Sequence, residues 1–167
     1  MNDEHPRIDE AAGQWRLVQG DLAPGETVLL TVKSGSMLPL LPVGARIEVA
    51  HVAGSRCRVG DVVVFRQDDR LVVHRLIFGS GDAPLGWFLQ RGDGYSPAGF
   101  LRTGSILGRV VAVHAAEGGV RRLTGGNERW QARREARGSL DRYVYSLLAA
   151  PARKVRRWLK RGNTDSA

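Results

Sequence analysis

Short apolar runs and turn residues alternate through the middle of the chain. Between residues 27 and 114, six runs rich in Val, Ile, Leu or Phe are separated by Gly, Pro or Asp. Runs of this length, broken by residues that favour turns, are typical of β-strands joined by short loops. The sequence therefore predicts a mainly β body with these strands: Thr27 to Lys33, Ala45 to Val52, Asp61 to Arg66, Leu71 to Phe78, Gly86 to Gln90 and Ser105 to His114.

Apolar residues recur at helical spacing on both sides of this body. The spacing between residues 8 and 15 indicates a short helix in an N-terminal arm. Apolar residues between 140 and 148 fall at i, i+3, i+4, i+7 and i+8, which predicts C-terminal α-helix. Asn127 and Ser139 are the predicted N-caps of two successive helical segments. The predicted organisation is an arm at 1–26, a β body at 27–124 and a basic helical extension at 125–167.

Positive charge gathers in the C-terminal extension. The net charge is +8, and residues 128–161 hold 11 Lys and Arg against three acidic residues, whereas the rest of the chain has 14 of each sign. A cationic helix with an apolar side fits an anionic membrane surface. It fits equally a helix that docks on the domain's own apolar surface. A nucleic-acid-binding arm is the least favoured alternative. The sequence gives no indication of the oligomeric state.

Several classes of protein are excluded by what the sequence lacks. Cys57 is the only cysteine, so no internal disulfide can form. With one cysteine and no His-x-x-x-His pair, we expect no metal site and no cofactor. The chain has no run of 18 apolar residues, and its acidic first 26 residues contain no apolar run. We therefore expect neither a membrane span nor an export signal, and a cytoplasmic location, either free or at the inner face of the membrane.

The segment Ser34-Gly35-Ser36-Met37 follows directly on a predicted strand. A serine hydroxyl becomes a good nucleophile only when a base removes its proton, and the oxyanion that forms needs donors already aimed at it. Gly35 leaves room for a substrate, and the amide of Ser36 with the hydroxyl of Ser34 can supply an oxyanion hole. Taken alone, the segment is also an ordinary turn.

Four segments resemble, in order and approximate spacing, the conserved boxes of type I signal peptidases and of the peptidase domains of LexA-type repressors. They are Ser34 to Leu41, Val59 to Phe65, Leu71 to Leu76 and Phe88 to Asp93. Four boxes in register are far more specific than one, and the resemblance covers residues 28–113. It implies a β serine peptidase body that hydrolyses a peptide or precursor protein. By resemblance, the substrate strand pairs with the segment before Ser36 or its neighbour, with small side chains near the cleaved bond.

The resemblance also implies roles for individual residues. Ser36 takes the place of the nucleophile, and Ser34 that of an oxyanion-hole donor beside the Ser36 amide. The general base is a lysine in the bacterial type and a histidine in the archaeal and endoplasmic-reticulum type, and Val73-His74-Arg75 occupies that place here. His74 is therefore the expected base, because neutral imidazole accepts a proton at physiological pH. The alternative is a structural histidine on an apolar face.

The third catalytic position departs from the family pattern. Histidine-type relatives carry an acid about six residues beyond the Gly-Asp motif to orient the base, and Gly99 stands at that place here. Asp93 is the candidate substitute, although an Asp between two glycines is also a common turn residue. Arg75 is expected to lie exposed on the opposite strand face, with the substrate backbone or an acid as its alternative partner.

Three functions remain open at this stage. The first is a serine endopeptidase, free or peripheral, that cleaves a specific precursor through a Ser36–His74 dyad. The second is a catalytically inactive binding or assembly module on the same fold, which the missing acid at Gly99 motivates. The third is a self-cleaving regulator of the LexA kind, with Ala98-Gly99 and Ala53-Gly54 as candidate bonds. Because 26 residues are too few for a helix-turn-helix, we expect none in this arm.

Overall fold

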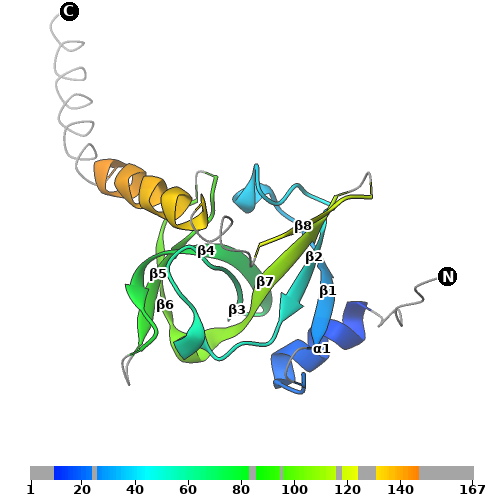
Figure 1. Ribbon diagram of the computed structural model, residues 1–167. Coiled ribbons are helices and arrows are strands. Elements are labelled where there is room, and N and C mark those ends of the chain that lie inside the picture. The colour runs from blue at the N-terminus through cyan, green and yellow to red at the C-terminus, as the bar shows by residue number, and fades with distance from the viewer. Residues whose placement is uncertain are drawn as a thin grey trace, which may run out of the picture.

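The computed structural model describes residues 10–23, 26–82, 86–94, 96–115, 118–123 and 131–146. They form an eight-stranded antiparallel sheet with α1 (Glu10–Gln19) beside β1 and a C-terminal helix, 131–146, on the opposite side (Figure 1). The predicted mainly β fold with a C-terminal helix is confirmed. The strands are β1 (Thr27–Thr31), β2 (Arg46–Ala50), β3 (Val62–Gln67), β4 (Arg70–Ser80), β5 (Trp87–Arg91), β6 (Gly99–Arg102), β7 (Ile106–His114) and β8 (Val120–Arg122).

The strands follow the order β1-β2-β7-β3-β4-β5-β6, and β8 pairs with β7. Each of the six predicted strands has its counterpart in this sheet. The sequence does not predict β6 or β8. β6 has four residues and begins at Gly99, and β8 has three residues, of which two are arginines, so neither shows an apolar run long enough to detect.

A tight hairpin joins β3 to β4 in the middle of the sheet. Gln67 lies opposite Arg70, and the two residues between them make the turn. One of these is Asp68, whose φ of 53° lies in the left-handed region that Asp tolerates better than most residues. The hairpin places His74 opposite Val63, in the middle of β4.

Strand β3 is buried on both faces of the sheet. Val62 and Val64 belong to one apolar cluster, and Val63 and Phe65 belong to another. Because successive side chains of a strand point to opposite faces, the two clusters lie on opposite sides of β3. The first cluster also contains Met37, which is 1% exposed and therefore anchors the turn that carries Ser36.

The C-terminal helix packs against the body. Ala136 is fully buried, and the guanidinium of Arg91 donates to the backbone carbonyl of Ser139 at 3.0 Å. The helix runs without interruption through Gly138 and Ser139. The predicted N-cap at Ser139 is therefore wrong, because this residue lies inside the helix on its buried side, where it is 1% exposed. Glycine at 138 does not end the helix, since contacts with the body hold both turns.

Docking on the body was one of three alternatives for the extension, and the described part, 131–146, does dock. Asn127 and the last two residues of the apolar stripe, Leu147 and Leu148, lie outside the described residues. The membrane or nucleic-acid role of 128–161 stays a prediction. Among the described helices, none is long and apolar enough to cross a membrane.

Candidate active site

Ser36 lies in a single turn of 3-10 helix, η1 (Gly35–Met37), just after β1. Ser34 precedes this turn in an extended conformation, and its Oγ lies 3.4 Å from the Oγ of Ser36. The side chain of Met37 enters the core, whereas Ser36 is partly exposed. The turn therefore presents a serine hydroxyl at the surface on a rigidly anchored backbone, with the hydroxyl of Ser34 beside it.

The backbone of Ser36 is tied to the Gly-Asp segment that follows β5. The amide of Gly94 donates to the carbonyl of Ser36 at 2.9 Å. A Cβ atom at Gly92 would collide with that same carbonyl, so only glycine allows this close approach. The first and fourth predicted boxes therefore meet at the candidate nucleophile.

His74 lies partly buried on β4, and β4 passes beside η1. Its Nδ1 forms a hydrogen bond with the side-chain oxygen of Gln90 on β5, and the ring of Phe65 meets it edge-on at 6.1 Å. Burial lowers the pKa of His74 below 6.5, although the hydrogen bond with the Gln90 oxygen and the charge of Asp93 act in the opposite direction. The imidazole is therefore neutral at physiological pH, which is the form that accepts a proton.

Within the described residues, no hydrogen bond joins Ser36 to His74, and each side chain has another partner. The Ser36 hydroxyl lies against Ser34, and Nδ1 of His74 is hydrogen-bonded to Gln90. Hydrogen bonds between catalytic groups are often long or unformed before substrate binds. The arrangement still leaves Nε2 as the ring atom that is not committed to Gln90.

Arg75 is buried, so the prediction that it lies exposed is wrong. Its side chain is 2% exposed and holds Asp93 through two bonds of 2.8 and 2.6 Å. It also donates to the carbonyl of Gly60 at 3.0 Å and pairs with Glu135 of the C-terminal helix at 2.7 Å. The alternative that an acid binds Arg75 is the one found. The helix covers this strand face, and the paired carboxylates compensate the buried cation.

Asp93, the expected orienting acid, gives both carboxylate oxygens to Arg75. It acts on His74 through its charge, while the hydrogen-bond partner of the ring is the side-chain oxygen of Gln90. The catalytic role of Asp93 stays a prediction. Sequence reasoning missed Gln90, although it lies within the fourth box only three residues before Asp93.

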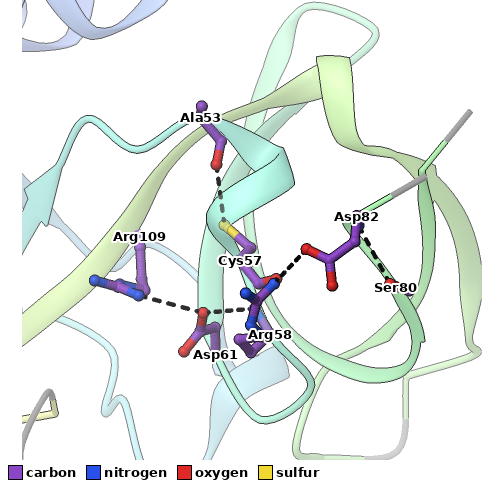
Figure 2. Close-up of polar contacts among 7 residues, drawn as sticks. All are labelled: Ala53, Cys57, Arg58, Asp61, Ser80, Asp82 and Arg109. Carbon is purple, nitrogen blue, oxygen red and sulfur yellow. Dashed lines mark hydrogen bonds and ion pairs between the residues drawn. The ribbon is translucent and has the colours of Figure 1, made fainter. Parts of the chain in front are cut away.

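A network of hydrogen bonds and ion pairs holds the start of the second box, Val59 to Phe65. Asp61 accepts a hydrogen bond from the backbone amide of Arg58 at 2.9 Å and pairs with Arg109 at 3.5 Å (Figure 2). The side chain of Arg58 in turn pairs with Asp82 at 2.9 Å (Figure 2). Cys57 is fully buried beside this network, and burial raises the pKa of its thiol to about 12. These contacts fix the turn before β3 and do not reach Ser36.

The described residues contain no group of three or more His, Cys, Asp or Glu side chains that could hold a metal ion. The side-chain hydrogen bonds of Ser36 and His74 involve two hydroxyls, an imidazole and the amide of Gln90.

Comparison with known proteins connects this geometry to a family. Residues 3–85 match the family described as Peptidase S24-like. The chain contains a Peptidase S24-like domain. This domain places it in the superfamily of LexA and the signal peptidases, as the resemblance of its boxes predicts. The matched range contains both Ser36 and His74, and it ends before Gln90 and Asp93. A search of curated proteins gives no match.

Proposed function

We propose that this S24-like protein is a serine endopeptidase that cleaves a specific peptide or precursor protein through Ser36 and His74. The observation that carries the proposal is the position of both residues within the S24-like match, on elements that the fold brings side by side. The proposed chemistry is the same whether the protein is free in solution or bound at a membrane surface.

The proposed reaction follows from the groups around Ser36. Nε2 of His74 takes the hydroxyl proton, and Oγ of Ser36 attacks the carbonyl carbon of the substrate. The amide of Ser36 and the hydroxyl of Ser34 donate to the oxyanion that develops. The imidazolium then gives its proton to the leaving amine, and a water molecule activated by the same ring hydrolyses the acyl-enzyme.

The edge of β1 supports the proposed mode of substrate binding. β1 stands at one end of the strand order, and η1 with Ser36 follows it directly. An extended peptide can add to such an edge through backbone hydrogen bonds. A peptide paired with this edge would run toward the Ser36 hydroxyl.

The test compares wild type, Ser36→Ala and His74→Ala on peptides from a lysate of the native host. Each protein is incubated with the lysate, and cleaved products and acyl-enzymes are identified by mass spectrometry. We expect new peptide termini with wild type and none with either variant. Products that appear equally with Ser36→Ala would refute the proposal and leave an inactive binding module as the better description.

Self-cleavage is a second candidate, and the structure favours one of its two bonds. At the Ala53-Gly54 bond, Ala53 is exposed, but Gly54 is buried and lies so close to the carbonyl of Thr103 that a Cβ there would collide with it. The Ala98-Gly99 bond is partly exposed and lies at the start of β6, next to Gln90 and so close to His74. A drop in intact mass on incubation between about pH 6 and 10, absent in Ser36→Ala, supports this candidate.

A further inference from the structure

Gln90 and His74 are diagonal neighbours across β4 and β5. Gln90 pairs with Leu76, so the ring of His74, two residues earlier, lies on the same face as the Gln90 side chain. Gln90 is 6% exposed, and its Oε1 is hydrogen-bonded to Nδ1 of His74. A buried amide that makes such a contact holds the ring in one orientation.

An amide oxygen can only accept a hydrogen bond, so the ring atom opposite it must be the donor. This requires the proton on Nδ1 and leaves Nε2 with a free lone pair. Neutral histidine has a single ring proton, and the hydrogen bond at one nitrogen decides the state of the other. The contact therefore selects the tautomer that a general base needs.

Gly99 makes room for this amide. It lies directly opposite Gln90 in the pairing of β5 and β6, and a Cβ atom at Gly99 would collide with Nε2 of Gln90. A larger residue at 99 would require the amide of Gln90 to move from the position in which it contacts His74. The absence of an acid at position 99 is therefore matched by a side chain that fills the same space from the neighbouring strand.

We infer that Gln90 is the positioning residue of the peptidase site: its side-chain oxygen accepts the Nδ1 proton of His74, which leaves Nε2 free to take the proton of Ser36. This inference rests on the proposed peptidase function. It assigns to a neutral amide the role that was expected of Asp93, whose carboxylate is engaged by Arg75. Asp93 contributes only its charge.

The experiment compares wild type with Gln90→Met and Gln90→Glu, and uses Gln67→Met as the matched control. Gln67 is an exposed glutamine at the end of β3, away from His74. Nitrogen-15 NMR of the histidine rings reports which nitrogen of His74 carries the proton and the pH at which the ring titrates. The rate at which a fluorophosphonate modifies Ser36, followed by mass spectrometry, reports the reactivity of the hydroxyl.

We expect wild type and Gln67→Met to carry the proton on Nδ1 of His74. Gln90→Met shifts it toward Nε2 and slows modification of Ser36 by about 10²- to 10⁴-fold, since general-base catalysis contributes this much and a histidine in the wrong tautomer loses up to the larger factor. Gln90→Glu keeps the proton on Nδ1 and moves the titration of His74 upward by about 1 to 3 pH units, because a carboxylate stabilises the imidazolium. The pH below which the rate of Ser36 modification falls rises by the same amount.

An Nε2 proton in wild type, or an unchanged tautomer and rate in folded Gln90→Met, overturns the inference. If Gln90→Met does not fold, the titration of His74 in Gln90→Glu decides alone, and an unchanged value overturns it. The NMR result does not depend on catalysis. A wild type that fails to react at Ser36 while His74 keeps its Nδ1 proton refutes the proposed function and leaves the positioning contact intact.

Discussion

Replacing Arg75 by Met removes a buried cation on which several segments converge. The carboxylate of Asp93, 13% exposed, would lose both of its hydrogen bonds and remain largely buried. The carbonyl of Gly60 would lose a donor as well. Breaking a buried ion pair by removing one partner costs about 3 to 5 kcal/mol, since the remaining charge is uncompensated. That is a large part of the total of about 5 to 15 kcal/mol that holds a domain folded.

Urea unfolding followed by far-UV circular dichroism measures this loss. At a slope near 2 kcal/mol per M, the midpoint should fall by about 2 M in Arg75→Met. Glu135→Gln is the matched control, because Glu135 is 51% exposed and pairs with the same guanidinium; an exposed pair contributes less than about 1 kcal/mol. In the double variant Arg75→Met/Asp93→Asn, part of the loss should be recovered. A free energy of unfolding for Arg75→Met that lies within about 1 kcal/mol of the wild-type value refutes the reasoning.

Three further outcomes follow from contacts described above. Gly92→Ala should destabilise the fold by about 1 to 3 kcal/mol and abolish fluorophosphonate labelling of Ser36, whereas Gly104→Ala, whose added Cβ meets nothing within 4 Å, should change neither; equal effects would point to a general loss of backbone freedom. Burial lowers the pKa of His74 in the folded protein. The stability that comes from keeping this ring neutral is therefore complete above the unfolded-chain pKa of about 6.5, and it is lost as the pH falls from there through the lower pKa of the folded protein. Urea midpoints measured at several pH values should fall over this range in wild type and fall less in His74→Phe. Cys57, with its pKa raised to about 12, should resist iodoacetamide at pH 8 until urea unfolds the chain, and rapid labelling of the native protein would contradict its burial.

The sequence predicts the strands because their signals are local: apolar runs bounded by turn residues mark them. The candidate residues Ser36 and His74 are predicted from four short segments in the right order, since each segment alone is ambiguous. Period-two alternation puts His74 and Arg75 on opposite faces of β4. It does not show that a helix from 131–146 covers the second face, which is why the burial of Arg75 could not be predicted.

The hydrogen bond between Gln90 and His74 could not be predicted from the sequence, for a different reason. It depends on the register of β4 against β5, which shifts at a bulge between Leu76 and Phe78. It depends also on Gly99 in β6, and this strand of four residues begins with a glycine and shows no apolar run from which it could be predicted. Pairing register and the space beside a glycine are properties of several strands together, and no segment of sequence carries them alone.

The hydrogen bond from Gly94 to the carbonyl of Ser36 bears on the order in which the protein is made. A nascent chain that has emerged only as far as β4 already carries Ser36 and His74, yet it contains neither Gly94 nor Gln90. In such a chain, the carbonyl of Ser36 lacks the hydrogen bond from Gly94 that holds the turn, and Nδ1 of His74 lacks its partner Gln90. On the ribosome, the arrangement on which the proposed reactivity of Ser36 depends would thus form only after β5 and the segment that follows it have emerged.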